Sequence, residues 1–408
     1  MKSVKIMLVV LVAGLLAVGI GSSAFAFHEG GVARCSGCHS MHSPASASNL
    51  MVGLDPSSTC LSCHEKAGDT GPSSYHVSTA VVDMPAGIAP LQRSPGGDFG
   101  WLKKTYTFDS HGIKTEDGAT FGHDITASGK GYTGRSNNLN APGGGTFPTA
   151  SLACNSCHDP HGKYRRDSTG AVTLGGGQII ASGSYDTSLI PTGTDTVGVY
   201  RLLAGNGYTK GGVTFNAAPV AVAPKTYNRT EATTQTRVSY GVGGATGTGT
   251  WSNWCKTCHP AMHSTGNNVH PVDQGIGDTN AGFYNAYVKT GDMGGTIATA
   301  YSSLVPFAKN SGDFITLAAL AKNDDTSLGG PESGDQVMCL SCHRAHASGS
   351  PAMLRWYMGS EFVTEEGDYV MESRGRTVSE AAAVYYDRPA TQFATYQRVL
   401  CNKCHAQD

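Results

Sequence analysis

Two cysteines, two residues apart and followed at once by a histidine, recur six times along this chain. In this signature the thiols bond to the vinyl groups of a porphyrin and the histidine ligates the iron, so the signature attaches a c-type haem. The six copies use two cysteines each and account for all 12 in the chain. The cysteines are Cys35, Cys38, Cys60, Cys63, Cys154, Cys157, Cys255, Cys258, Cys339, Cys342, Cys401 and Cys404. The proximal histidines are His39, His64, His158, His259, His343 and His405. The sequence therefore predicts six covalently bound haems c.

Cysteine pairs have two other common uses. Four thiolates from two pairs bind zinc, and closely spaced pairs form disulfides in redox enzymes. Neither use calls for a histidine directly after each pair, whereas all six pairs here have one. Haem attachment explains the whole pattern and leaves no cysteine over.

Nine of the 15 histidines lie outside the motifs and are available for the second axial position of each iron. The six predicted distal ligands are His42, His76, His123, His161, His270 and His346. His28 and His263 are reserve candidates, and His111 is the weakest of the nine. Methionine is the rival ligand, and Met41, Met262 and Met338 lie near motifs, but a thioether packs equally well against a porphyrin. We expect bis-histidine haems, which have lower potentials than methionine-ligated ones.

Three distal candidates share a spacing. His42, His161 and His346 each lie three residues after a motif histidine. The two axial positions lie on opposite faces of the porphyrin, so a histidine this close along the chain is poorly placed for its own iron. Each is therefore expected to ligate a neighbouring haem, which would hold the haems close together.

The beginning of the chain predicts export. Residues 1–26 combine a lysine-bearing start, an apolar core over 6–20 and a small-residue cleavage site at 24–26, as in a cleaved secretory signal. An uncleaved anchor helix is the alternative. Residues 27–408 then form a single hexahaem domain, with no later run apolar enough to span a bilayer. We expect a secreted protein that reaches the outer cell surface through the periplasm.

Composition limits the fold and the partners. The formal net charge is −2, which excludes a strongly basic nucleic-acid-binding protein. Only 39% of residues are hydrophobic and 54 are glycine, so an ordinary core would be poor. Porphyrins supply apolar surface that side chains otherwise provide. We predict a multihaem cytochrome c fold that is loop-rich, with short helices and few short strands wrapped around a linear haem chain.

Local patterns add a few elements. Segments 125–150 and 232–250 are rich in Gly, Thr, Ser and Asn, which favours loops or irregular hairpins. Residues 172–184 fit a short hairpin turning at three glycines. The predicted helices span 281–290, 313–322, 379–386 and 390–403.

Longer strings give a resemblance. They are Phe27-His28 with 30–33, then 67–76, 96–101, 158–166, 226–237 and 401–406. On these strings, which have no generic role, the mature chain resembles the OmcS-like family of hexahaem outer-surface cytochromes. The resemblance implies little regular structure, bis-histidine haems in a continuous line, and a head-to-tail homopolymer outside the cell. It also implies that His42 ligates the haem at Cys339, Cys342 and His343 of the adjacent protomer. Departures fall in 125–150 and 240–255, and His111 has no counterpart in the family.

The expected function is long-range extracellular electron transfer, through stacked haems in a filament, to other cytochromes and to acceptors such as metal oxides or electrodes. The alternative is a discrete periplasmic or outer-surface shuttle that does not polymerise. An enzyme such as a nitrite or hydroxylamine reductase needs an iron with an open position, often marked by lysine in place of the motif histidine. All six motifs end in histidine, so we expect no catalytic residues.

Overall fold

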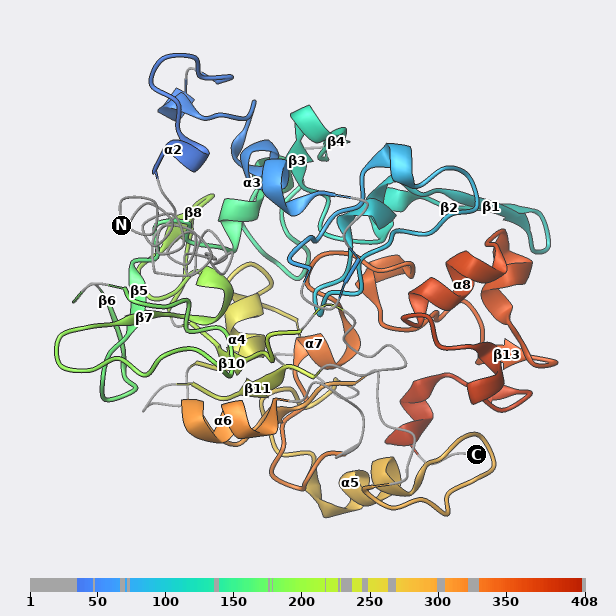
Figure 1. Ribbon diagram of the computed structural model, residues 1–408. Helices are drawn as coiled ribbons and strands as arrows, with labels where there is room; N and C mark the ends of the chain where they lie inside the picture. The colour runs from blue at the N-terminus through green and yellow to red at the C-terminus, as the bar shows by residue number, and fades with distance from the viewer. Residues whose placement is uncertain are drawn as a thin grey trace, which may run out of the picture.

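The protein is described by a computed structural model over most of its length after the predicted signal. The described residues are 35–46, 48–66, 70–71, 74–135, 139–174, 177, 179–216, 218–226, 228, 237–243, 249–262, 269–298, 305–321 and 330–405. Short elements joined by long loops make up this part of the chain (Figure 1). The segment with helix α2 (Cys35–Cys38) lies at one corner, apart from the C-terminal region. The predicted loop-rich fold is confirmed.

The helices are short, and side chains fix where several of them begin. Besides α2, the α-helices of the described residues are α3 (Pro56–His64), α4 (Trp251–Lys256), α5 (Gly277–Ala286), α6 (Phe314–Leu320), α7 (Cys339–Cys342) and α8 (Val378–Val384). Asp55 caps α3 by accepting from the Ser58 amide at 2.7 Å, and Pro56 has a φ suited to the first turn. Thr377 and Glu380 form a capping box at the start of α8. Caps matter here because such short helices are marginal alone.

The described strands form small separate sheets. Three are two-stranded: β1 (Tyr106–Asp109) with β2 (Ile113–Glu116), β3 (Thr126–Ala127) with β4 (Tyr132–Thr133), and β8 (Thr209–Lys210) with β9 (Val213–Thr214). Three are three-stranded: β6-β5-β7, β10-β11-β12 and β14-β13-β15. Their strands are β5 (Tyr164–Arg166), β6 (Val172–Leu174), β7 (Val197–Gly198), β10 (Val220–Val222), β11 (Ser239–Gly241), β12 (Ala308–Lys309), β13 (Phe362–Glu365), β14 (Asp368–Tyr369) and β15 (Gln397–Arg398).

Apolar side chains gather in separate clusters among the described residues. The largest combines Trp101, Phe121 and Trp356 with Tyr385 and its neighbours near the C-terminus. A second surrounds Trp251 and Met338, beside two of the Cys-x-x-Cys-His motifs. The clusters thus pack around the motif segments instead of forming one continuous core.

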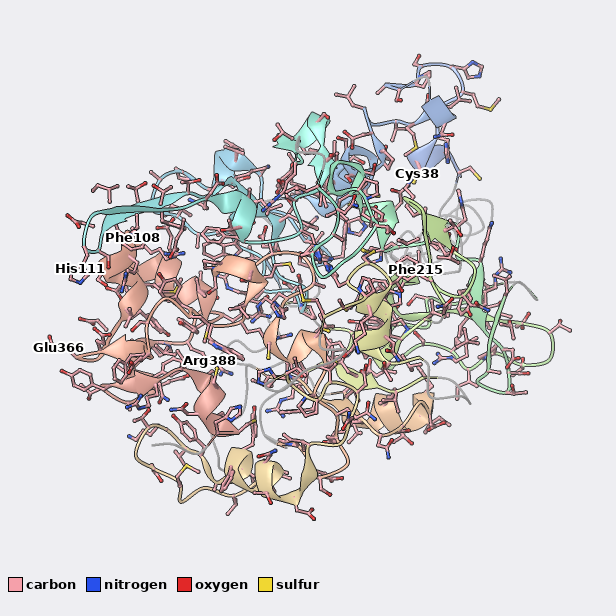
Figure 2. All side chains as sticks on the ribbon, turned by 180° about the vertical axis from the view of Figure 1, so that it is seen from behind. Cys38, Phe108, His111, Phe215, Glu366 and Arg388 are labelled. Atoms are coloured by element: carbon pink, nitrogen blue, oxygen red, sulfur yellow. The ribbon has the colours of Figure 1, made fainter. Side chains whose placement is uncertain are left out.

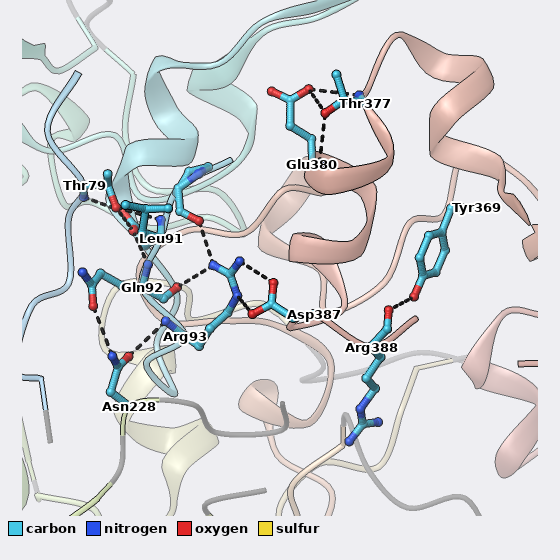
Figure 3. Close-up of polar contacts among 12 residues, drawn as sticks. Thr79, Leu91, Gln92, Arg93, Asn228, Tyr369, Thr377, Glu380, Asp387 and Arg388 are labelled. Atoms are coloured by element: carbon cyan, nitrogen blue, oxygen red, sulfur yellow. Dashed lines mark hydrogen bonds and ion pairs between the residues drawn. The ribbon is translucent and has the colours of Figure 1, made fainter. Parts of the chain in front are cut away.

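Polar contacts tie distant parts of the chain together (Figure 3). The Arg93 guanidinium donates to both carboxylate oxygens of Asp387, at 2.6 and 2.9 Å. Its backbone amide donates to the Asn228 side chain at 3.0 Å. The first third of the chain is therefore fastened both to its middle and to its C-terminal region.

One predicted helix is wrong. Residues 390–403 form the 3-10 helices η11 (Ala390–Gln392) and η12 (Leu400–Lys403), with strand β15 between them. Gln397 explains the difference: its buried side chain donates to the Tyr287 hydroxyl at 2.6 Å, and its amide donates to Thr364 Oγ1 at 3.0 Å. These tertiary contacts outweigh the helix propensity of the segment.

The hairpin predicted over 172–184 is also wrong. Strand β6 is antiparallel to β5, which precedes it in the chain, so the chain reverses between residues 166 and 172. The Asp167 carboxylate makes this turn by accepting from the amides of Thr169 and Ala171. Turn chemistry upstream, and not the glycine run, decides the pairing.

The other predicted elements are present with shifted ends. Helix α5 begins four residues before the predicted 281 and ends at Ala286, α6 lies inside 313–322, and α8 overlaps 379–386. An irregular hairpin, β3–β4, lies in 125–150, whereas 239–241 in the second Gly-rich segment is strand β11. The predicted signal at 1–26 lies outside the described residues. No helix in the described part has the length and apolar character needed to cross a membrane.

Candidate haem-binding sites

Each Cys-x-x-Cys-His motif occupies a single helical turn. The amide of the motif histidine donates to the carbonyl of the first cysteine at Cys35, Cys154, Cys255, Cys339 and Cys401, over 2.8 to 3.2 Å. The second motif, Cys60 to His64, ends helix α3. A turn of this kind brings both thiols to one side of the backbone, as attachment to one porphyrin edge requires. All 12 cysteines are free of disulfides.

Backbone carbonyls orient the motif histidines. The Nδ1–H groups of His39, His64, His158, His259 and His343 donate to the carbonyls of Asn49, Tyr75, Arg201, Pro142 and Ala352, over 2.7 to 3.0 Å. A carbonyl on Nδ1 fixes the tautomer and leaves Nε2 as the free ligating atom, which is the usual outer-sphere arrangement of a metal-bound histidine. Five of the six rings are thus prepared to bind a metal through Nε2.

The three motifs followed by a second histidine share one backbone scaffold. We call them the first, third and fifth modules: residues 35–42 with 48–52, 154–161 with 200–204, and 339–346 with 351–355. In each, the backbone amide of the residue after the motif histidine donates to the carbonyl of Leu50, Leu202 or Met353, at 2.7 to 2.8 Å. Two residues further on, the amides of Val52, Ala204 and Arg355 donate to the carbonyl of the second cysteine, at 2.8 to 3.0 Å. The repetition shows one structural unit used three times.

This scaffold holds its carbonyl acceptor in a strained conformation. Asn49, Arg201 and Ala352, which accept from the motif histidines, have φ of 61°, 51° and 56°. The next residue in each module, Leu50, Leu202 or Met353, also has a positive φ. Left-handed backbone at a non-glycine residue costs about 1–2 kcal/mol, and such strain persists only where the surroundings enforce it. The same strain at three equivalent places marks it as part of the site.

Three predicted distal histidines lie beside motif histidines. The ring centres are 6.4 Å apart for His158 and His346, 6.2 Å for His123 and His259, and 6.0 Å for His270 and His405. Two imidazole nitrogens held about 2 Å from one metal ion on opposite sides place the ring centres about 6 Å apart. These three pairs therefore fit bis-histidine ligation of one iron each. In the first of these pairs, His346 is the second histidine of the fifth module and lies beside His158, the motif histidine of the third module.

Burial favours the neutral form of three of these rings. It lowers the pKa of His123 and of His158, and lowers the pKa of His346 to about 3. The neutral imidazole is the form that binds a metal. The Nδ1 of His123 is also fixed, since it donates to the Ala345 carbonyl at 2.7 Å.

The remaining distal candidates have different settings. His76 is buried with its Nδ1 3.0 Å from Ser74 Oγ. His42 and His161 are exposed side chains. His111 is at the tip of the β1–β2 hairpin, far from Cys38 and the projecting first module (Figure 2). The reserve candidates His28 and His263 lie outside the described residues.

The cysteines reveal the order of the motifs in space. The Cys60 and Cys154 thiols are hydrogen-bonded, which raises the pKa of Cys60 and lowers that of Cys154. A hydrogen bond from Cys255 lowers the pKa of Cys339 to about 7. These contacts join the second motif to the third and the fourth to the fifth.

Weaker electrostatic contacts complete the series. Burial, and then the charge of Cys258, raise the pKa of Cys157 to about 12, which places the third motif beside the fourth. Burial, and then the charges of Cys60 and Cys63, likewise raise the pKa of Cys38. Burial and the charges of Cys401 and Cys404 raise the pKa of Cys342. The six motifs are therefore neighbours in the order in which they occur along the chain.

Within the part of the chain that the structure describes, no three His, Cys, Asp or Glu side chains converge on a common metal position. Sequence reasoning missed the carbonyl acceptors. Three of the five acceptors, Asn49, Arg201 and Ala352, share one signal, a pair of large apolar residues directly after the acceptor: Leu50-Met51, Leu202-Leu203 and Met353-Leu354.

Comparison with known proteins gives a consistent result. No family model matches the chain. The chain is 48% identical to C-type cytochrome OmcS of Geobacter sulfurreducens, over 100% of both chains. It resembles a solved outer membrane cytochrome S filament of that organism with a TM-score of 0.85 and 48% identity, covering 94% of this chain and 100% of the other. A cryo-EM structure of OmcS nanowires gives a TM-score of 0.84 and 47% identity, with the same coverage. At this identity over its whole length, the chain belongs to the OmcS family of c-type cytochromes.

Proposed function

We propose that this protein is a hexahaem c-type cytochrome that carries electrons along a filament of its own copies, outside the cell, to other cytochromes and to acceptors such as metal oxides or electrodes. The observation that carries the proposal is the order of the cysteine pairs, in which each Cys-x-x-Cys-His motif is a neighbour of the next motif along the chain. Two relatives solved as filaments support the assembly. The predicted signal at residues 1–26 fits export through the periplasm.

The chain's own residues fasten, orient and enclose each site. Two thiols would anchor the porphyrin, and Nε2 of the motif histidine and a second imidazole would bind its iron. When bound, haem supplies an iron that gains and loses one electron without any bond being made to substrate. A closed iron leaves no position for substrate, so we propose an electron carrier and not a catalyst.

From the ring pairs we propose three distal ligands: His346 for the iron at His158, His123 for that at His259, and His270 for that at His405. His76 follows the second motif and supplies the iron at His64, whose Nδ1 is held by the neighbouring Tyr75 carbonyl. Two distal candidates then remain, His42 and His161. Two irons also remain, at His39 and His343.

The shared scaffold assigns the last two. In the fifth module the second histidine lies beside the motif histidine of the third module, two motifs earlier. The third module has the same backbone hydrogen bonds, so His161 is expected to reach the iron of the first module at His39. By the same rule His42 of the first module reaches two motifs back, beyond its own chain. In a head-to-tail polymer of six-motif units, that position is the fifth motif of the preceding protomer, at His343.

A contact of this kind does not close on itself, so it generates a filament. It also makes assembly depend on metal ligation, because a lone protomer has one iron short of a ligand.

Intact mass and electron microscopy of the secreted protein test the proposal. We expect a mass that includes six haems, a fully low-spin absorption spectrum, and filaments in negative stain. A mass short of six haems would disprove the site assignment. Six haems in particles that never polymerise would identify the discrete shuttle instead.

A further inference from the structure

The three modules differ at one equivalent position. The residue whose amide donates to the second cysteine's carbonyl is Val52 in the first module, Ala204 in the third and Arg355 in the fifth. The backbone is the same at all three places, so the difference is in the side chain alone. A cation takes the place of an aliphatic group in the fifth module only.

Arg355 is held against the fifth motif. Its side chain is 1% exposed, and its Nε donates to the Leu340 carbonyl at 2.7 Å, inside helix α7. Its backbone amide donates to the carbonyl of the attachment cysteine Cys342 at 2.9 Å. The guanidinium therefore lies beside the attachment site itself.

A second cation accompanies it. The residue directly after the motif histidine is Ser40 in the first module, Asp159 in the third and Arg344 in the fifth. Arg344 is also 1% exposed, with its guanidinium 3.6 Å from the centre of the Tyr386 ring.

The charges of the three modules are unequal as a result. The first module contains no charged side chain. In the third, Asp159 and Arg201 have opposite charges. The fifth has Arg344 and Arg355 and no acidic residue. Two buried positive charges thus distinguish the fifth module from two modules with a balanced or zero charge.

Oxidation of a haem iron adds one positive charge to the site. A fixed cation disfavours that added charge, and it does so strongly where the surroundings exclude water. Burial and nearby charge are among the means by which a protein tunes a haem. We propose that Arg355, assisted by Arg344, sets the reduction potential of the haem at Cys339 and Cys342 above those of the haems in the first and third modules. The inference rests on the proposed function, because it requires a haem at each motif.

A spectroelectrochemical titration of the intact six-haem protein tests this. In Arg355→Met, the reduction potential of one haem, at the positive end of the titration, is expected to fall by about 59 mV. This shift is a tenfold change in the electron-exchange equilibrium between that haem and the unchanged haems. Arg355→Lys keeps the charge and should keep the wave in place. Lys114→Met removes an exposed cation from β2 and serves as the matched control, with no shift expected.

The reciprocal variant does not depend on Arg355 tolerating replacement. Val52→Lys places a cation at the equivalent position of the first module, which is only partly buried. One other wave should then move to higher potential, by a smaller factor than in Arg355→Met because water screens the charge at this position. Unchanged waves in Arg355→Met with all six haems present, or in Val52→Lys, would overturn the inference. Fewer than six haems in the unaltered protein would instead contradict the proposed function, so the two failures are distinguishable.

Discussion

The first and fifth modules have the same backbone and opposite surroundings. In the first, helix α2 has no buried residue and the Met41 side chain is 80% exposed. In the fifth, Leu340, Ser341 and Arg344 are buried, and the amide of His346 donates to the Gly96 carbonyl at 2.7 Å. The same motif and the same strained turn thus give either an internal site or a projecting one. What surrounds the unit, and not the unit itself, decides whether it lies inside the protomer or at its surface.

Removal of the projecting histidine should have the largest effect. His42→Ala is expected to abolish filaments and leave one high-spin haem per protomer, because the iron at His343 loses its ligand from the next copy. Electron microscopy and absorption spectra measure the two effects.

The matched control is His161→Ala, the same change in the third module. It should also give one high-spin haem, but filaments should persist because its iron lies in the same chain. Normal filaments with every haem low-spin in His42→Ala would refute the assignment.

The next largest effect is expected at the backbone contact between Gly97 and Ala347, which holds the end of the fifth module and is called the clamp below. Gly97 has φ of 89° and is bridged to Ala347, so an added Cβ would overlap the Ala347 carbonyl oxygen. We expect Gly97→Ala to lower the free energy of unfolding by about 3 kcal/mol, measured by denaturant titration of the haem-loaded protein.

Gly282→Ala is the control for that change. Gly282 lies in α5 with open space around an added Cβ, and alanine there should stabilise by up to about 1 kcal/mol. Equal effects of the two substitutions would show that the clamp contributes nothing.

A smaller effect is expected at Met41. If the projecting module inserts into the preceding protomer, this exposed side chain becomes buried there, which is worth about 1.5–3 kcal/mol. Met41→Ser should therefore raise the protomer concentration needed for polymerisation at least tenfold, while every haem stays low-spin in filaments that do form. The equivalent exposed residue of the fifth module, Ala345, should tolerate serine without any change in assembly.

The strained turn gives the smallest effect. Ala352→Gly relieves the positive φ of the fifth module but adds freedom to the unfolded chain, so we expect a gain in stability below about 1 kcal/mol. Asn49→Gly in the first module should gain less, because asparagine adopts this conformation more easily than alanine. Thermal unfolding of both variants measures the difference, and a larger gain for Asn49→Gly would contradict this account of the strain.

Local patterns allowed the motif turns, the loop-rich character and the distal candidates to be predicted from the sequence. Several other features depend on partners far along the chain and could not be predicted. His346 lies beside His158 although a large part of the chain separates them, and the carbonyl acceptors Asn49, Arg201 and Ala352 have side chains of unrelated types. The segment around Gln397 has helical propensity, yet contacts with Tyr287 and Thr364 make it a strand. The order of the motifs in space required the positions of the thiols.

In such a filament, the second histidine of a module serves an iron two motifs earlier. This offset gives the filament a polarity. At one tip the iron at His343 has no second imidazole, and at the other tip a His42 has no iron. The first tip is therefore a high-spin centre, open to small ligands such as free imidazole or cyanide. The second tip is a ready ligand for any haem exposed on another protein. Growth, capping and docking onto a cell-surface partner are consequently different chemical events at the two ends of the same polymer.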